Sequence, residues 1–186
     1  MRVVAGIAKG RRLAAPKGDT TRPTSDFVRE AIFNAIGSQT DLEGASVADL
    51  FAGSGAMGIE ALSRGAASAD LVEVDRVAVT TIRQNLESTG LAGGAVHQSD
   101  VVKWLQRQAI GGGFDVVFAD PPYAFDGWRA LLDAIATHLA GDERARLVVI
   151  ESDRELDLGE GWEVLRAKRY GTTVVTLTSP NPRSHT

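Results

Sequence analysis

The sequence predicts an α/β domain built on a doubly wound, mostly parallel sheet that ends in an antiparallel hairpin. Short apolar runs such as LVVI and DVVFA lack polar alternation, which is typical of strands covered by helices on both faces. From residue 46 onward these runs alternate with helical patterns, which indicates consecutive strand–helix–strand units. Two alternating segments near the C-terminus predict the closing hairpin.

The predicted elements of the sheet follow one another at ordinary spacing. We expect strands at residues 47–51, 69–74, 95–98, 114–119 and 146–151, and helices at residues 56–64, 77–88, 101–108 and 128–139. The hairpin strands are expected at residues 162–167 and 172–178, with a turn at 168–171. Helices then cover both faces of the sheet, so its ligand site is expected where the carboxyl ends of the strands meet.

The N-terminal part precedes the sheet pattern and is expected to differ from it. Residues 1–18 predict a small basic β-hairpin extension, with strands at 2–8 and 12–16, and residues 19–186 form the main domain. The segment RPTSDFVREAIFNAIG predicts a helix, because Thr24 or Ser25 can cap it and Gly37 can end it. We expect this helix to pack across the edge of the sheet.

Composition excludes several classes of protein. The 186 residues hold no cysteine, which excludes disulfides, thiolate zinc sites and a cysteine nucleophile. The three histidines lie far apart without metal-ligand spacing, so no metal is expected. No apolar run has the length of a membrane span, and the N-terminus lacks the pattern of a signal peptide. We therefore expect a cytoplasmic protein without a membrane partner, and a monomer.

Charge is distributed unevenly along the chain. Residues 1–18 hold 5 of the 20 Lys and Arg residues and no acid, whereas the rest of the chain holds all 24 Asp and Glu residues. A basic arm on an acidic body indicates contact with a polyanion, and a solvated tail is the alternative. The candidate contact residues are Arg2, Lys9, Arg11, Arg12 and, just beyond the arm, Arg22.

A glycine pattern, G-x-G-x-x-G, follows the first strand of the sheet. Gly53 allows a tight turn, Gly55 lets a ligand approach the backbone, and Gly58 lets the next helix pack close to the strand. Such a turn binds nicotinamide, flavin and adenosyl cofactors alike. The pattern therefore predicts a nucleotide-containing cofactor without choosing among these three.

Acidic residues at the ends of the neighbouring strands complete the predicted cofactor site. Glu73 ends the second strand, where a carboxylate can accept hydrogen bonds from ribose hydroxyls, and Asp75 is expected to cap the next helix instead. Asp100 can accept from the adenine amine, cap the next helix, or both, while Val101 and an apolar neighbour enclose the ring. Asp49 can tie the glycine turn or meet the amine of a methionine moiety.

The segment Asp120-Pro121-Pro122-Tyr123 follows the fourth strand and selects the chemistry. Its prolines remove two backbone donors and stiffen the chain, leaving a carboxylate and rigid carbonyls beside an aromatic ring. The Asp120 carboxylate and the Pro121 carbonyl can grip the two N–H bonds of a nucleobase amine, while Tyr123 stacks on the base. The freed lone pair of the nitrogen then points at a methyl donor, so positioning dominates catalysis.

With these motifs, the sequence resembles the bacterial 16S ribosomal RNA guanine-N2 methyltransferase family that modifies position 966. The resemblance covers nearly the whole chain and includes RVVAGIAKGRRL, RPTSDFVREAIFNAI, DLFAGSGAMGIEALSRGA, LVEVDR and DPPY. It implies the Rossmann-like fold of class I methyltransferases and S-adenosyl-L-methionine as the methyl donor. It also implies guanine N2 of 16S rRNA as acceptor, in the small ribosomal subunit or an assembly intermediate. It further places the RPT segment, with Thr24, near the methionine end of the cofactor, and the basic hairpin on RNA.

Three alternatives stay open at this point. A DNA adenine-N6 methyltransferase also uses DPPY, although such enzymes usually add a target recognition region for which this chain has no room. A nicotinamide-dependent oxidoreductase would use the glycine turn but has no evident use for DPPY. A non-enzymatic assembly factor would bind rRNA and keep the pocket only for stability.

Overall fold

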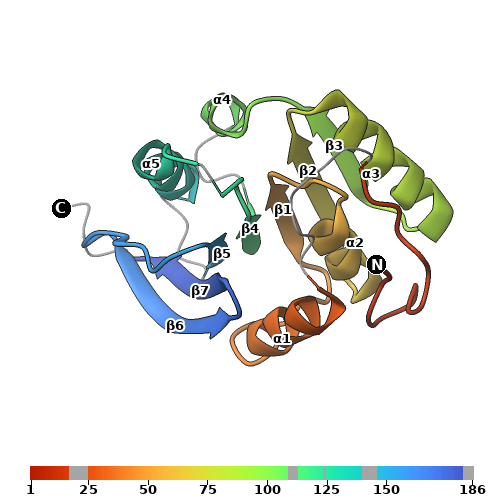
Figure 1. Ribbon diagram of the computed structural model, residues 1–186, viewed down its shortest axis with the longest axis horizontal. Helices are drawn as coiled ribbons and strands as arrows, with labels where there is room; N and C mark the ends of the chain where they lie inside the picture. The colour runs from red at the N-terminus through yellow and green to blue at the C-terminus, as the bar shows by residue number, and fades with distance from the viewer. Residues whose placement is uncertain (17–24, 109–112, 124, 140–145, 182–186) are drawn as a thin grey trace.

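The computed structural model describes residues 1–16, 25–108, 113–123, 125–139 and 146–181. Within these ranges a seven-stranded sheet of order β3-β2-β1-β4-β5-β7-β6 lies between two layers of helices (Figure 1). The first five strands in this order are parallel, and β7 runs antiparallel to both of its neighbours, β5 and β6. This arrangement confirms the predicted fold class.

The first and last residues of most strands and helices lie within a few residues of their predicted positions. The strands are β1 (Ser46–Leu50), β2 (Ser68–Glu73), β3 (Gly94–Gln98), β4 (Val116–Ala119), β5 (Leu147–Ser152), β6 (Trp162–Tyr170) and β7 (Thr173–Pro180). The helices are α1 (Asp26–Ile36), α2 (Ala56–Ser63), α3 (Arg76–Thr89), α4 (Val101–Arg107) and α5 (Trp128–Leu139). No helix within the described ranges is long and apolar enough to cross a bilayer.

The topology fixes where a ligand can bind. Leu50 at the end of β1 pairs with Val72 of β2 on one side and with Ala119 of β4 on the other. The chain winds outward from β1 through β2 to β3 and then returns to β4, so the winding direction reverses between β1 and β4. Ligands of open α/β sheets bind at this reversal, beyond the carboxyl ends of the strands. We call this end of the sheet the carboxyl edge.

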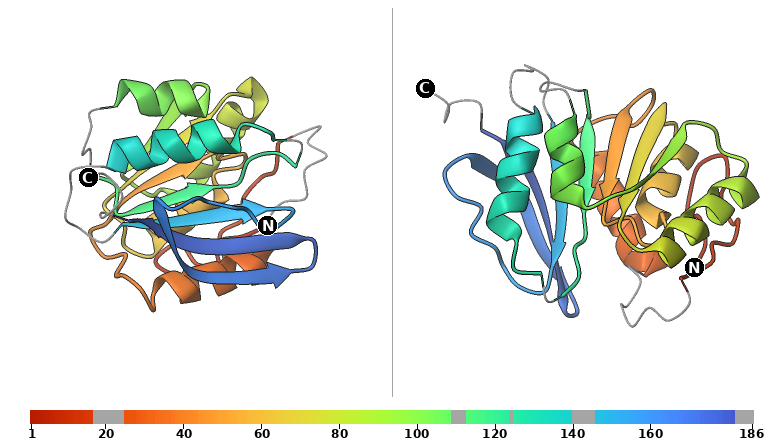
Figure 2. Two further views of the ribbon diagram at one scale, coloured as in Figure 1. Left: turned by 90° about the vertical axis from the view of Figure 1, so that its left-hand side faces the viewer. Right: turned by 90° about the horizontal axis from the view of Figure 1, so that it is seen from above.

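Two apolar layers hold the helices on the sheet. Helices α1, α2 and α3 pack on one face and α4 and α5 on the other (Figures 1 and 2). The prediction that α1 packs across the edge of the sheet is wrong. Its side chains Ile32, Phe33 and Ile36 are buried on the face formed by β4, β5 and β7, where the Phe33 ring lies 5.5 Å from that of Phe118. A helix with an apolar stripe buries more apolar surface when it covers a face of the sheet than when it lies along an edge.

The N-terminal segment folds back on itself, but the predicted strands at residues 2–8 and 12–16 are wrong in extent. Arg2 and Arg12 form an isolated antiparallel bridge, the Val3 N–H donates to the Arg11 carbonyl at 2.9 Å, and the Leu13 N–H donates to the Met1 carbonyl at 3.1 Å. Val3, Ala8 and Leu13 are buried together with side chains of α2. We call residues 1–16 the strap, because they run along α2 and α3.

Side chains of the neighbouring helices bind backbone groups of the strap between and beyond its paired residues. Glu60 of α2 accepts hydrogen bonds from the backbone N–H groups of Val4 and Ala5, at 2.7 and 2.9 Å. Asn85 of α3 accepts from the backbone N–H of Ala14 at 2.8 Å and donates to its carbonyl at 3.0 Å. These contacts fix the strap against the helices. The division of the chain into an extension at residues 1–18 and a domain at residues 19–186 stays a prediction.

The C-terminal hairpin differs in detail from its prediction. Strand β6 continues through Lys168 and Arg169 to Tyr170, so the turn lies at Gly171 and Thr172 rather than at residues 168–171. β7 is buried on both faces and β6 is largely exposed, so neither shows the expected alternation. β7 lies between β5 and β6, and β6 forms the free edge.

Candidate active site

The glycine turn after β1 is held by three hydrogen bonds. The Gly53 N–H donates to the Glu73 carboxylate at 2.9 Å, and the Gly55 N–H donates to the Ala52 carbonyl at 2.6 Å. The Gly58 N–H, in the first turn of α2, donates to the Asp49 carboxylate at 2.9 Å. Carboxylates from β1 and β2 therefore shape the turn by accepting its backbone donors.

The three glycines have different surroundings. A Cβ on Gly53, where φ is 54°, would meet nothing closer than a backbone oxygen at 3.9 Å, so this glycine leaves open space for a ligand. A Cβ on Gly55 would lie 2.9 Å from the Leu71 side chain, and one on Gly58 would lie 3.0 Å from it. The expected packing role of Gly58 is therefore present. The Leu71 side chain of β2 occupies the space that a side chain at Gly55 would need. Gly53, rather than the predicted Gly55, therefore leaves room for a ligand beside the turn.

Phe51 belongs to this turn, and sequence reasoning missed it. Its φ of 62° is the one left-handed non-glycine conformation among the described residues. Such a conformation costs free energy and occurs mainly where the surroundings enforce it. The ring lies edge-on to Phe125, with centroids 5.3 Å apart, so Phe51 joins the glycine turn to the chain beyond DPPY. In the sequence it looks like the last residue of an apolar strand, which conceals this role.

Glu73 and Asp100 lie on neighbouring strand ends, as expected. Besides Gly53, the Glu73 carboxylate accepts from the backbone N–H groups of Val74 and Asp75, at 2.8 and 2.9 Å. Asp75 caps α3 by accepting from the Ala78 N–H, as predicted for it, and Asp100 caps α4 through the Lys103 N–H. A carboxylate oxygen accepts more than one hydrogen bond, so these caps and ties leave acceptor capacity for a ligand.

The apolar neighbours of these carboxylates differ in exposure. Val74 is 64% exposed and Val77 is 49% exposed, so both offer surface to a flat ring beside Glu73. The predicted contact Val101 is buried at the start of α4. Val77 was not singled out from the sequence, because a valine in the first turn of a helix usually packs inward.

Asp49 is a buried carboxylate with one hydrogen bond from Gly58. Burial raises its pKa from 3.8 to about 8, and the nearby negative charges of Asp120 and Glu73 act in the same direction, against the Gly58 hydrogen bond. The charges of Asp120 and Glu73 thus oppose the ionisation of Asp49 at the carboxyl edge. A cationic group placed among them would remove this repulsion.

The DPPY segment lies directly beside the glycine turn. The Asp120 N–H donates to the Leu50 carbonyl at 3.5 Å, so its backbone meets β1 where the turn begins. Asp120 keeps exposed surface, yet desolvation by the surrounding protein raises the pKa of its carboxyl from 3.8 to about 6. The carboxyl group therefore lies among protein atoms at an opening to solvent. Pro121, which follows it, is buried.

Tyr123 lies farther out on the same segment. Its side chain is 50% exposed, and its hydroxyl lies 3.4 Å from the Thr172 hydroxyl in the turn between β6 and β7. An exposed ring at this position is free to stack on a base. The hairpin turn therefore borders the DPPY segment.

The predicted residues for polyanion contact fall into two groups. Arg2, Lys9, Arg11 and Arg12 are exposed on the strap. Arg2 pairs with Asp26 at 3.5 Å, and Arg11 donates to the Ser88 carbonyl at 2.9 Å. Ile7, also on the strap, is 87% exposed and was not predicted as a contact. Arg22 and Thr24 lie outside the described residues, and Ser25 caps α1.

Comparison with known proteins identifies relatives over nearly the whole chain. The model of the family described as "Conserved hypothetical protein 95" matches residues 1–179. A Bacillus subtilis protein named "Putative rRNA methyltransferase YlbH" is 41% identical over 182 residues, covering 95% of this chain and 97% of the relative. The Escherichia coli K12 protein named "Ribosomal RNA small subunit methyltransferase D" is 34% identical over 185 residues, covering 95% of this chain and 88% of the relative.

Solved structures agree with this relationship. The Escherichia coli structure described as "Putative methyltransferase yhhF" has a TM-score of 0.84 and 30% identity, over 98% of this chain and 99% of that chain. A Thermus thermophilus structure of a hypothetical protein has a TM-score of 0.79 and 34% identity, over 95% of this chain and 98% of that chain. The chain belongs to the family described as conserved hypothetical protein 95, and it is a class I methyltransferase related to small-subunit ribosomal RNA methyltransferase D.

Proposed function

We propose that this chain transfers a methyl group from S-adenosyl-L-methionine to the exocyclic N2 amine of a guanine in 16S rRNA. The observation that carries the proposal is the hydrogen bond from Asp120 to Leu50, because it sets the acceptors of DPPY beside the glycine turn. A site for an amine and a site for a nucleotide cofactor then share one end of the sheet. The names of the relatives support rRNA as the substrate.

The residues of the carboxyl edge fit this cofactor. When bound, S-adenosyl-L-methionine supplies an electrophilic methyl group on a positively charged sulfur, next to a cationic ammonium group. Burial raises the pKa of Asp49 to about 8, so this carboxyl is mostly protonated at pH 7, and the charges of Asp120 and Glu73 act in the same direction. A cation bound beside these three residues would lower the pKa of Asp49 and favour its charged form. Gly53 leaves open space at the turn, Glu73 can accept from the ribose, and Asp100 can accept from the adenine amine.

The DPPY residues prepare the guanine amine for attack. Its lone pair is delocalised into the ring, so the nitrogen is a poor nucleophile until its N–H bonds are held. The Asp120 carboxylate and the Pro121 carbonyl accept these two bonds, and Tyr123 holds the ring by stacking. With a pKa of about 6, Asp120 is mostly ionised at pH 7 and therefore an acceptor. After transfer, Asp120 or water takes the proton that the nitrogen loses.

The substrate is proposed to be the small ribosomal subunit or an assembly intermediate, with the strap contributing Arg2, Lys9, Arg11 and Arg12 to RNA binding. Ribosomal particles form in the cytoplasm, so we propose that this chain acts there. A monomer presents both the strap and the carboxyl edge to such a particle, and we propose this state.

Mass spectrometry of nucleosides tests the proposal. Small subunits from cells that lack the chain's activity are incubated with S-adenosyl-L-methionine, with and without the protein, and their rRNA is digested. We expect N2-methylguanosine to appear only with the protein. Duplex DNA is the matched second substrate, and N6-methyladenine in DNA without methylated rRNA would overturn the proposal in favour of DNA methylation.

A further inference from the structure

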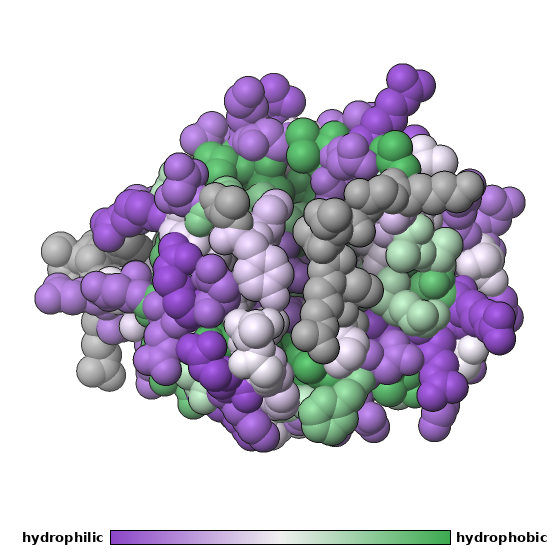
Figure 3. Space-filling model, in the orientation of Figure 1, coloured by the Kyte–Doolittle hydropathy of each residue, from purple (hydrophilic) through white to green (hydrophobic). Residues whose placement is uncertain are grey.

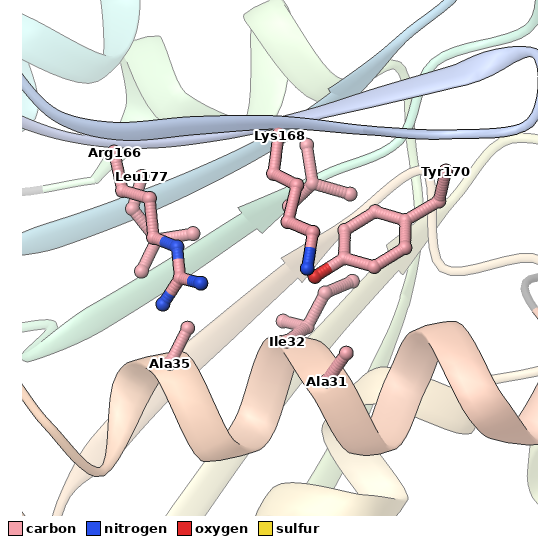
Figure 4. A pocket seen from close by; sticks show the side chains of 8 residues that line it. Ala31, Ile32, Ala35, Arg166, Lys168, Tyr170 and Leu177 are labelled. Carbon is pink, nitrogen blue, oxygen red and sulfur yellow. The ribbon is translucent and has the colours of Figure 1, made fainter.

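We propose that the side of β6 facing α1 is a second RNA-binding surface, which holds the unpaired RNA segment next to the target nucleotide. The inference rests on the proposed function and assigns a task to residues outside the cofactor and DPPY sites. Residues 164–170 of β6 contain no acid, and two of their three cations, Arg166 and Lys168, lie on the side that faces α1 (Figure 4). A cluster of cations on a chain of net charge -4 favours a polyanionic partner.

The side chains of β6 gather on one surface. Arg166, Lys168 and Tyr170 alternate along the strand and extend together toward α1, where Ala31 and Ala35 face them (Figure 4). The small alanine side chains leave a shallow groove beneath the two cations. The pocket in it measures about 10 Å³, room for about one water molecule, so a ligand lies along the groove rather than inside it.

The two cations are available to bind phosphate. The Lys168 ammonium lies 5.0 Å from the centre of the Tyr170 ring, which holds it over the groove without neutralising it. Within the described residues neither Arg166 nor Lys168 forms an ion pair with a carboxylate. Charges on an edge strand also discourage pairing with another sheet, and the experiment separates that role from RNA binding.

Aromatic side chains continue the surface toward the catalytic segment. Phe27, in the first turn of α1, is 70% exposed and lies edge-on to Tyr170, with ring centroids 6.4 Å apart. The face of the molecule in Figure 3 is mostly hydrophilic, with hydrophobic side chains in several separate patches. Proteins bind single-stranded RNA with exposed aromatic rings, which stack on the bases, and with neighbouring cations, which contact the phosphates.

The hairpin topology brings this surface to the active site. Ser152, the last residue of β5, pairs with Val174, so the turn between β6 and β7 lies at the carboxyl edge. Thr172 in that turn approaches Tyr123 of DPPY, and Tyr170 lies two residues away. A base stacked on Phe27 and phosphates held by β6 would therefore belong to the same RNA segment as the nucleotide held by Tyr123.

The first test neutralises the groove. The double variant Arg166→Gln/Lys168→Gln is compared with Arg107→Gln/Arg129→Gln, which removes two exposed cations from α4 and α5 on the opposite face. We expect KM for small subunits to rise about tenfold with kcat nearly unchanged. The slope of log affinity against log salt for single-stranded RNA should shrink by about 1.4, since each phosphate contact contributes about 0.7. Affinity for S-adenosylhomocysteine should stay constant.

The second test addresses stacking. Phe27→Ala should weaken RNA binding on the order of tenfold, and Phe27→Tyr should retain it because the ring remains. The inference is overturned if the β6 variant matches the control variant in KM and salt slope, or if its only defect is aggregation. If the wild-type protein methylates no rRNA, the proposed function itself fails, which is a separate outcome.

Discussion

At the scale of single residues, Asp49 is a carboxyl group of the carboxyl edge whose charged form is unfavourable in the absence of a cation, first because it is buried. Asp49 is buried and hydrogen-bonded to the Gly58 N–H, yet the charges of Asp120 and Glu73 still oppose its ionisation. Such an arrangement is unfavourable for stability and favourable for binding a cation. The folded chain therefore favours binding of the cofactor's positive charge beside Asp49.

The raised pKa of Asp49 predicts a pH-dependent stability. The folded chain keeps a proton on Asp49 up to about pH 8, whereas the unfolded chain releases it near pH 3.8. Because the folded state binds more protons in this window, the free energy of unfolding falls as pH rises, by at most about 1.4 kcal/mol per pH unit.

Asp49→Asn isolates this effect, because an amide oxygen can still accept from Gly58 and does not titrate. Urea unfolding without cofactor should show the wild type losing on the order of 3 kcal/mol relative to the variant between pH 5 and pH 8. If the free energy of unfolding changed with pH in the same way for both proteins, the predicted effect of Asp49 would be contradicted.

At the scale of elements, α2 connects the strap to α1 through one buried carboxylate. Glu60 is fully buried and receives hydrogen bonds from Val4, Ala5 and Arg64, while the buried Arg29 of α1 lies 3.6 Å away. Removing a partner from a buried ion pair leaves an uncompensated charge. The strap and α1 therefore depend on the same residue.

Glu60→Ala should lower the free energy of unfolding by about 3–5 kcal/mol. Two backbone donors and the Arg64 side chain lose their acceptor, and the buried Arg29 keeps Asp26 but loses its second ion-pair partner. Hydrogen exchange at the Val4 and Ala5 amides should accelerate more than exchange in β1. Glu30→Ala, on the exposed side of α1, is the matched control and should change stability by about 0.5 kcal/mol or less. Equal stabilities of the two variants would remove Glu60 from this role.

At the scale of the whole molecule, the sheet was predictable because its signals are local. Continuous apolar runs marked the parallel strands, and the caps at Ser25, Asp75 and Asp100 marked the helix starts. The acids of the carboxyl edge followed from their positions at strand ends.

The errors arose where distant partners decide the conformation. The strap is shaped by side chains of Glu60, Ser63 and Asn85, which lie about 55 to 71 residues away and leave no local pattern. Strand β6 was cut short because Lys168 and Arg169 resemble a turn, although a free edge strand tolerates charge on both faces. The left-handed Phe51 contacts Phe125, which is 74 residues away and gives no local pattern at Phe51.

The central claim, that Asp120 and the Pro121 carbonyl hold the guanine amine for methylation, is tested most directly by the single-turnover rate of Asp120→Ala. With small subunits and S-adenosyl-L-methionine both saturating, we predict a rate about 100- to 1,000-fold below wild type, because one preorganised acceptor is lost. Affinity for S-adenosylhomocysteine, which lacks the positively charged sulfur, and affinity for RNA should both stay within about twofold of wild type. Methyl transfer by Asp120→Ala at the wild-type rate would contradict the account.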